Sequence, residues 1–279
     1  MKPATSETSQ EIVSRSGSNL AFALAVLPPE KRRDMQVFYA FCRVIDDIAD
    51  TPDIPILDRI MALDHWRNVI SGEAENSGVE SEFQEVVKKY DLSEVLLNDI
   101  IDGVSMDFEP LRFQTAQDLK QYCFKVASAV GLISIEIFGY RNPSTKIYAE
   151  ELGYALQWTN IMRDVAEDAA ESRIYLPLQD LDRFGIRESD LLDRKIPQRG
   201  FRKLMEQQGI VARAFYESSA LALPIEDKPN LRSPELMRRI YFGILKKMEN
   251  DNYRVFEKRY RLSKVRMLSE FFRAKFLSS

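Results

Sequence analysis

Histidine and cysteine are scarce in this chain of 279 residues, which contains one histidine and two cysteines. The single histidine, His65, excludes a metal centre built from several histidines, and any Ser-His-Asp or Cys-His site would depend on it alone. Its surroundings, Asp64-His65-Trp66-Arg67, are typical of a helix surface. Cys42 and Cys123 lie in apolar stretches at a spacing that fits neither a disulfide framework nor a zinc site. We therefore expect carboxylates, arginines and tyrosines to carry the chemistry, in a reducing compartment.

The chain also lacks an excess of basic residues and long apolar runs. A net charge of −4 and an isoelectric point near 5.4 exclude the basic surface that nucleic-acid binding requires. The apolar run at residues 20–27 is too short to span a bilayer, which takes about 18 residues or more, and no later run reaches that length. Residues 1–19 are polar and lack the features of a signal peptide. We expect residues 1–15 to form a flexible tail and the protein to be cytoplasmic.

Strand patterns, internal repeats and Gly/Ser linkers are absent from the sequence as well. Hydrophobic residues make up 45% of the chain, which is ample for a sizeable core. Helix start and stop signals such as Pro28-Pro29-Glu30, Ser93, Thr115 and Gly139 divide the chain into segments. They predict helices over residues 28–50, 56–70, 93–108, 115–139, 144–172, 199–221 and 235–262. The sequence therefore predicts one all-α domain over residues 16–279.

Two acidic motifs stand out in this helical pattern. The first acidic motif is residues 46–50, Asp-Asp-Ile-Ala-Asp, and the second acidic motif is residues 160–168, Asn-Ile-Met-Arg-Asp-Val-Ala-Glu-Asp. Each contains two aspartates four residues apart, which share one face of a helix: Asp46 with Asp50, and Asp164 with Asp168. Like charges at this spacing repel each other by roughly 0.2–0.5 kcal/mol, so each pair needs a compensating partner.

An acidic pair of this kind is often no more than a solvated helix face. The neighbours on the two faces argue against that interpretation, because a solvated face would be richer in Lys and Glu. They are Tyr39, Cys42 and Arg43 for the first motif, and Gly153, Gln157 and Asn160 for the second. Mg²⁺ offers the compensating charge, since it takes one or two carboxylates, keeps several waters and completes its shell with phosphate oxygens. Two facing pairs would form a polyphosphate site.

Two other segments each allow two interpretations. Small residues are concentrated at positions 122–131, where they permit either close packing of a neighbouring helix or the lining of a pocket. Residues 265–276 alternate phenylalanines with basic residues, which is typical both of a weak interfacial helix and of a tail that packs on the body. Peripheral contact with the inner face of a membrane is therefore left open.

The motifs, taken in order, resemble the squalene/phytoene synthase family. Residues 39–50 and 157–168 carry the resemblance, with support from Met106-Asp107, residues 122–131, Arg173-Ile174-Tyr175-Leu176-Pro177, and Tyr253 with the basic run after it. The match covers roughly residues 16–265. It implies the isoprenoid synthase fold, a bundle of helices around a deep apolar central cavity with the two acidic motifs facing each other across its mouth. It also implies head-to-head joining of two prenyl diphosphates with Mg²⁺, through a cyclopropylcarbinyl diphosphate.

The resemblance also implies roles for individual residues. Those at or near the metal are Asp46, Asp47, Asp50, Asn160, Asp164 and Asp168. Those that contact the substrate are Arg43, Arg163, Tyr253, Asn160, Arg173, Ser16, Tyr39 and Gln157. Tyr122 is similar to a family tyrosine near the reacting carbons and joins the four paired aspartates as a catalytic residue. The family usually has Ser-Phe-Tyr where this chain has Ser18-Asn19-Leu20, which leaves open the group that closes over the second diphosphate.

The length of the substrate is the main alternative. Two farnesyl diphosphates would give presqualene diphosphate and then squalene or a related C30 product, whereas two geranylgeranyl diphosphates would give phytoene. We favour the C15 route because the compact chain and its motifs resemble bacterial squalene-pathway members. No Gly-x-Gly-x-x-Gly follows a strand, so a Rossmann site is not indicated, and NADPH use and the oligomeric state are left open.

Two other classes of function also fit a helical protein with paired aspartates. One is a non-catalytic protein that binds Mg²⁺ or a prenyl diphosphate, and Arg43 and Arg163 argue against it, because metal storage needs neither arginine. The other is a cyclising terpene synthase with a single substrate, which the ordered set of motifs argues against.

Overall fold

The structure, a computed structural model, describes residues 7–16, 19–51, 53–74 and 77–276 and consists of helices and connecting loops. The helices are α1 (Ser9–Ser16), α2 (Asn19–Leu24), α3 (Pro29–Ala49), α4 (Ile56–Ser71), α5 (Val79–Tyr90), α6 (Glu94–Met106), α7 (Ala116–Cys123), α8 (Ala129–Phe138), α9 (Ser144–Ala170), α10 (Leu178–Arg183), α11 (Glu188–Leu192), α12 (Gln198–Ala222), α13 (Arg232–Asn250) and α14 (Lys264–Phe276). A π-helical turn, η1 (Phe124–Ser128), joins α7 to α8, and η2 (Ile225–Asp227) is a 3₁₀ turn. Within the described ranges the only β contact is an isolated bridge between Arg112 and Ile174. The predicted all-α fold is confirmed.

Local sequence signals explain where the helices that carry the acidic motifs begin and end. Proline at the start of α3 has the backbone angle that a first helical turn requires. The helix ends at the first acidic motif, where the Asp50 N–H still donates to the Asp46 carbonyl at 2.9 Å. Thr115 and Asp118 form a reciprocal capping box at the start of α7, and Gly139, at φ +76°, ends α8. These boundaries match the predicted ones.

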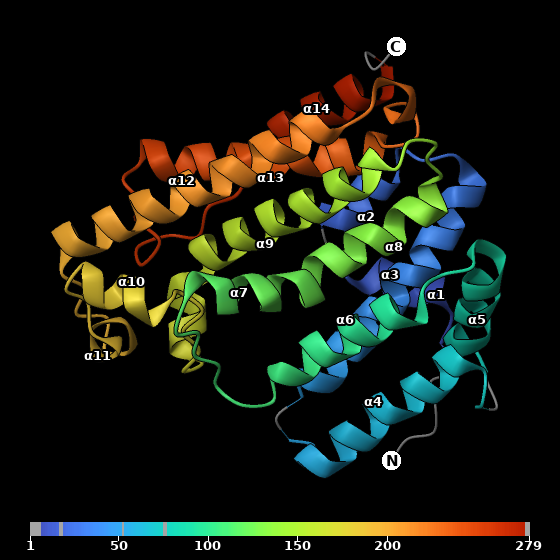
Figure 1. Ribbon diagram of the computed structural model, residues 1–279, viewed down its shortest axis with the longest axis horizontal. Helices are drawn as coiled ribbons and strands as arrows, with labels where there is room; N and C mark the ends of the chain where they lie inside the picture. Colours follow the sequence, from blue (N-terminus) through green and yellow to red (C-terminus); the bar gives the residue numbers. More distant parts are fainter. Residues whose placement is uncertain (1–6, 17–18, 52, 75–76, 277–279) are drawn as a thin grey trace.

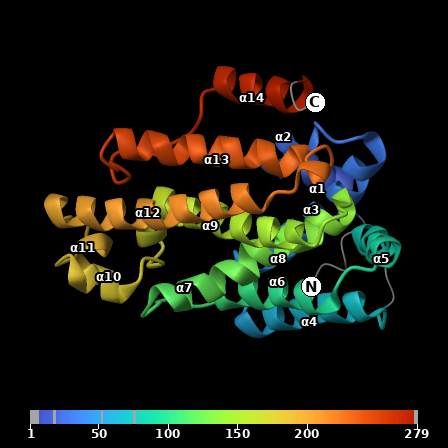
Figure 2. The ribbon, with the colours of Figure 1, turned by 45° about the horizontal axis from the view of Figure 1, so that its top comes forward.

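Helix α9 is the central element of the bundle. It packs against α12, α13, α8 and η1, and Figure 1 shows α9, α12 and α13 running side by side. In Figure 2 these helices lie in layers above α7, α6 and α4. Close approach requires glycine at position 153 of α9, because a Cβ there would lie 2.5 Å from the Ser128 Cα of η1. The small residues at 122–131 thus permit tight packing, and some of them also line a cavity.

Four expectations from the sequence differ from the structure. Residues 9–15, expected as part of a flexible tail, belong to α1, because Ile12 buries its side chain in the core. Helix α5 was not predicted, although Phe83 in it is fully buried. Helix α13 ends at Asn250 rather than near residue 262, since Asn252 and Tyr253 adopt positive φ. Pro143, not Ser144, is the N-cap of α9.

The C-terminal helix α14 packs on the body of the protein. The ring of Phe271 lies 5.3 Å from that of Phe22, and Ala274 is buried. Val265, Leu268 and Phe272 remain exposed on its outer side. One stretch, Ala116–Phe138, is long and apolar enough to cross a membrane by length and composition alone. It packs in the interior against α6 and α9, as a core helix does.

Candidate active site

The end of α3 places the first acidic motif beside an arginine of the same helix. Arg43 Nη1 lies 3.0 Å from Asp46 Oδ2, and the same guanidinium also pairs with Asp47. Asp50, at the C-cap of α3, faces the loop after α9, where Arg173 Nη2 lies 3.6 Å from its Oδ1. Arg43 therefore neutralises part of the motif, while the carboxylate of Asp50 points across to the second motif.

The C-terminal half of α9 carries the second acidic motif. Arg163 Nε donates to Asp164 Oδ1 at 2.7 Å, and Arg163 lies over the ring of Tyr241 with 5.9 Å from the guanidinium carbon to the centroid. Arg259 donates to the other oxygen of Asp164 at 3.0 Å and also approaches Glu167. Asp164 thus holds two arginines from different parts of the chain, a pattern suited to binding further anionic oxygens.

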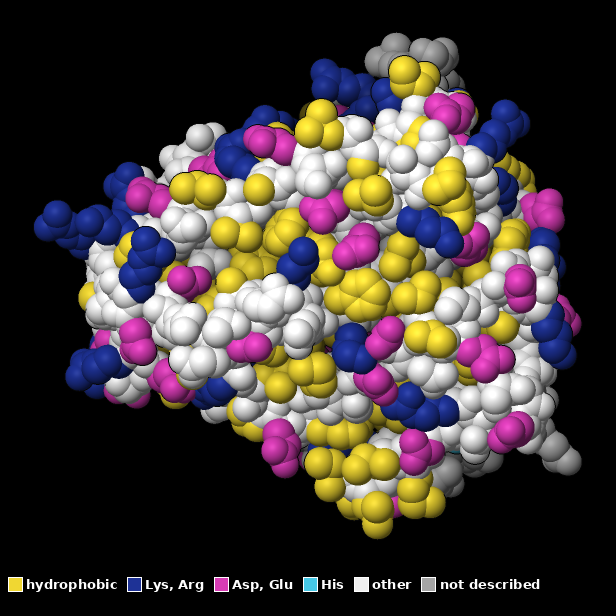
Figure 3. All heavy atoms as spheres, in the orientation of Figure 1, with side chains coloured by type: hydrophobic (Ala, Val, Ile, Leu, Met, Phe, Trp, Pro, Cys, Tyr) yellow, Lys and Arg dark blue, Asp and Glu magenta, His cyan; other side chains and the backbone are white. Residues whose placement is uncertain are grey.

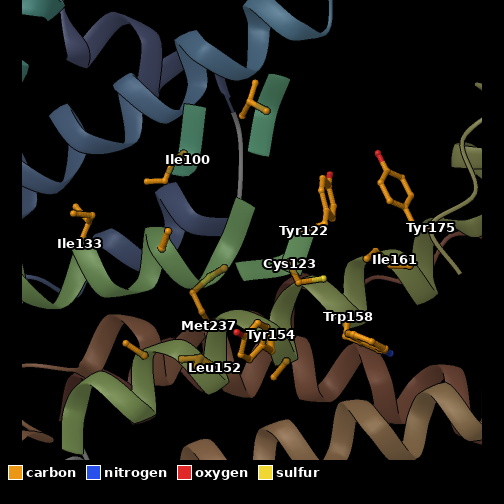
Figure 4. Packing of buried hydrophobic residues seen from close by; sticks show 14 of the residues in the cluster. Ile100, Tyr122, Cys123, Ile133, Leu152, Tyr154, Trp158, Ile161, Tyr175 and Met237 are labelled. Atoms are coloured by element: carbon orange, nitrogen blue, oxygen red, sulfur yellow. The ribbon is translucent and has the colours of Figure 1, made fainter. Parts of the chain in front are cut away.

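A half-buried carboxylate, that of Asp107, lines a hollow together with Asp50 and Arg173. Asp107 accepts a hydrogen bond from the Tyr122 hydroxyl at 2.9 Å on one oxygen and from the Tyr175 hydroxyl at 2.8 Å on the other. The two rings stack with centroids 5.4 Å apart, and Figure 4 shows their hydroxyls pointing the same way. Tyr175 belongs to a flap, residues 173–177, that follows α9 and is held against it by the hydrogen bond from the Arg173 N–H to the Asp168 carbonyl. Asp107 therefore fixes the position of both phenols.

Two carboxyl groups of the motifs are difficult to ionise. Burial and the charge of Asp50 raise the pKa of Asp46 to about 6. Burial and the charge of Asp164 raise the pKa of Asp168 to about 8, and Arg173 offsets only part of this effect. Negative charge is therefore in excess at both motifs, as expected where a cation is needed to complete the site.

The orphaned polar atoms of α9 fit a metal site. Asn160 Oδ1 and Glu167 Oε2 are both buried without a hydrogen-bond partner. Among the residues that the structure describes, no three His, Cys, Asp or Glu side chains converge closely enough to hold a metal ion by themselves. Mg²⁺ does not need such a cage, because it usually takes one or two carboxylates and completes its shell with waters and phosphate oxygens. The paired aspartates and the amide oxygen of Asn160 are ligands of this kind.

Two adjoining cavities begin at the two motifs. The first cavity, of about 250 Å³, extends from Asp46 and Arg43 along α3, past Tyr39 and Cys42. The second cavity, of about 260 Å³, extends from Asn160 along α9 between α8 and α13. Figure 4 shows Leu152 and Met237, which line the second cavity, on α9 and α13. Both cavities have largely apolar walls, which suits hydrocarbon chains.

The structure brings together most of the site residues predicted from the sequence. Asp46, Asp47, Asp50, Arg43 and Tyr39 lie at the end of α3, and Asn160, Gln157, Arg163, Asp164, Asp168 and Arg173 lie on α9 or just after it. Tyr253 lies elsewhere, between α12 and the end of α13, where a Cβ added at Gly209 would lie 2.6 Å from its hydroxyl oxygen. The side chain of Ser16 lies outside the described residues.

Sequence reasoning missed two residues of the site, Arg259 and Tyr241. Arg259 contacts Asp164, and Tyr241 lies beside Arg163 and lines the second cavity. The basic run after Tyr253 was a signal for Arg259. Because the sequence predicted one continuous helix through this run, it did not show that the chain turns back toward α9.

The bundle with a deep apolar interior and facing acidic motifs is the isoprenoid synthase fold. A dehydrosqualene synthase solved with a ligand superposes with a TM-score of 0.83 at 26% identity, covering 96% of this chain and 94% of that one. At the level of sequence, the family model described as squalene/phytoene synthase matches residues 13–266. The chain therefore belongs to the squalene/phytoene synthase family.

Curated relatives in this family carry two kinds of name. The presqualene diphosphate synthase of Zymomonas mobilis is 32% identical over 98% of this chain and 94% of its own length. The phytoene synthase of Arthrospira platensis is 33% identical over 92% of this chain and 89% of its own length. Because the identities are so similar, overall likeness does not choose between the two substrates.

Proposed function

We propose that the protein joins two prenyl diphosphates head to head, with release of diphosphate. The favoured substrates are two farnesyl diphosphates, which would give presqualene diphosphate and then squalene or a related C30 product. The observation that carries this proposal is the pair of adjoining cavities, which are nearly equal in volume and begin at different acidic motifs. A cyclising terpene synthase binds one prenyl chain, whereas two cavities can bind two prenyl chains.

The diphosphate groups of the substrates would bind at the arginines of the site. Arg43, Arg163 and Arg259 each pair with an aspartate of the motifs and can form bidentate contacts with phosphate oxygens. Mg²⁺, held by the paired aspartates and Asn160, would neutralise the leaving diphosphate and so favour ionisation of the allylic C–O bond. Asp47 would lie in the outer shell of this site, because it stands off the helix face that Asp46 and Asp50 share and its carboxylate pairs with Arg43.

The hydrocarbon chains would lie in the two cavities, whose apolar walls exclude water from the carbocation. Tyr122 would act near the reacting carbons, the role that the family resemblance implies, and the hydrogen bond from its hydroxyl to Asp107 would hold its ring in position. Arg173 would close the flap over the site through its pairing with Asp50. These roles are carried by side chains that the fold already holds in place.

Synthesis of phytoene from two geranylgeranyl diphosphates is the second candidate, supported by the phytoene synthase of Arthrospira platensis among the relatives. Incubation of the purified protein with Mg²⁺ and each labelled diphosphate, with and without NADPH, separates the candidates. A C30 lipid supports the squalene branch, and its form before and after phosphatase treatment shows whether the reaction stops at the cyclopropyl diphosphate. A C40 lipid moves the protein to the phytoene branch. Absence of product from either substrate would favour a non-catalytic binding protein.

We further propose peripheral contact with a lipid bilayer beside the mouth of the site. Figure 3 shows hydrophobic side chains gathered at the lower edge of the molecule, over α4. The exposed members there are Ile54, Ile56, Leu57, Ile60 and Met61. Arg59, in the same segment, lines the hollow beside Asp50, so the patch adjoins the site. Leu57→Asp should weaken co-sedimentation of the protein with phosphatidylcholine vesicles. Val265→Asp, measured in the same way, tests whether α14 contacts the bilayer instead.

A further inference from the structure

The two cavities share one wall. Four residues line both of them: Met35 of α3, Val126 of η1, and Val130 and Ser134 of α8. Met35 has the longest side chain of the four and is 2% exposed, whereas the other three are small. The Met35 side chain is therefore the main barrier between the two spaces.

The cavities differ in how far they extend from the acidic motifs. On α3 the first cavity ends at Met35, eleven residues before Asp46, which corresponds to about 16 Å of helix. On α8 it ends at Ser134, but the second cavity continues one turn further to Phe138, about 6 Å more. Tyr148 of α9 also lines only this deeper part. The first cavity is thus the shorter one, and Met35 stands at its inner end.

We propose that Met35 determines the length of the prenyl chain that the first cavity accepts. This inference rests on the proposed condensation of two prenyl diphosphates. A prenyl chain that is one isoprene unit too long for the first cavity would contact Met35. The deeper part of the second cavity lies on the other side of this side chain. Shortening the side chain would lengthen the first cavity by the space that the methionine side chain now fills, and this space would give the longer chain room. The second cavity accepts a longer chain without any change.

Met35→Ala tests the proposal, with Met237→Ala as the matched control. Met237 is also a cavity-lining methionine, but it lines only the second cavity and lies alongside it on α13. The measured quantity is the ratio of kcat/KM for geranylgeranyl diphosphate to kcat/KM for farnesyl diphosphate. We expect Met35→Ala to raise this ratio by about tenfold or more, the size of effect that a single methylene has in an apolar pocket. Met237→Ala should change both values together and leave the ratio near that of the wild type.

A mixture of the two diphosphates gives a second readout. The wild type should form C35 product in preference to C40, because only its second cavity admits a C20 chain, and Met35→Ala should shift the products to C40. Met35→Leu conserves volume and should keep the wild-type ratio, whereas Met35→Phe should lower it. These two variants decide the question if Met35→Ala does not fold.

An unchanged ratio in Met35→Ala or Met35→Phe, with turnover of farnesyl diphosphate retained, would overturn the role of Met35 and leave the proposed function intact. An equal shift in Met35→Ala and Met237→Ala would overturn it as well. If the wild type consumed neither diphosphate, the proposed function itself would be wrong.

Discussion

Arg173 Nη2 lies 3.6 Å from Asp50 Oδ1, and this ion pair connects the loop after the second acidic motif to the end of the first. Burial raises the pKa values of Asp107 and Asp168, and the same guanidinium offsets part of that rise, so one arginine affects carboxylates from three segments. The arrangement implies that the two motifs act together, although they lie more than a hundred residues apart in the sequence.

Removing this arginine should weaken metal binding. We expect Arg173→Gln to raise the Mg²⁺ concentration needed for half-maximal turnover by roughly tenfold, because the side chain orients carboxylates that would bind the metal. The measurement is a Mg²⁺ titration of turnover. Arg187→Gln, which removes an exposed arginine paired with Asp190, is the control and should behave as the wild type. Equal Mg²⁺ requirements in Arg173→Gln and the wild type would contradict the coupling.

The stability of the metal-free protein should fall as the pH rises. Burial and Asp164 raise the pKa of Asp168 from 3.8 to about 8, so between these values the folded state binds more protons than the unfolded chain. Stability contributed by the protonated carboxyl is therefore present at low pH and lost as the pH rises through about 8. Urea unfolding in EDTA at pH 6 and pH 9 measures this loss.

Asp168→Asn isolates the contribution of that residue. The variant cannot ionise at this position, so at pH 9 without metal it should be more stable than the wild type by at least ~1 kcal/mol, since one pKa unit corresponds to about 1.4 kcal/mol. It should also lose turnover, because the amide is a weaker ligand for Mg²⁺. If the difference in unfolding free energy between the wild type and the variant were the same at pH 6 and at pH 9, the pKa of Asp168 would not be raised.

Replacing either of the two tyrosines that bind Asp107 should cost the protein a similar amount of stability, but the two replacements should affect turnover differently. Each donates one hydrogen bond to the half-buried carboxylate, so Tyr122→Phe and Tyr175→Phe should each cost about 1 kcal/mol of unfolding free energy. We expect kcat to fall by at least about tenfold in Tyr122→Phe and by less in Tyr175→Phe, if only Tyr122 lies near the developing charge. Equal losses of kcat would instead assign both tyrosines to positioning Asp107.

The sequence predicted those parts of the site that depend on helix periodicity. The pairs Asp46 with Asp50 and Asp164 with Asp168 follow from the four-residue spacing, and each helix carries its own arginine, Arg43 or Arg163. Gly139 and the Thr115 capping box are likewise local signals, so the ends of the α7–α8 segment were predictable.

Features that depend on tertiary packing were not predictable in this way. Arg259 reaches Asp164 because α13 stops at Asn250 and the following turn, with Asn252 and Tyr253 at positive φ, redirects the chain. No residue in that stretch is a glycine that would have marked the turn. The partition at Met35 depends on the approach of α3 to α8, which a single helical pattern does not specify.

Isotope mixing tests the central claim, condensation of two prenyl chains, most directly. The purified protein is incubated with Mg²⁺ and an equal mixture of unlabelled and fully deuterated farnesyl diphosphate, and the lipid product is analysed by mass spectrometry. Two-chain condensation predicts a product in which molecules with one labelled chain are more abundant than molecules with none or with two. A product that is either fully labelled or unlabelled, with no mixed molecules, would show that only one chain is used and would contradict the account.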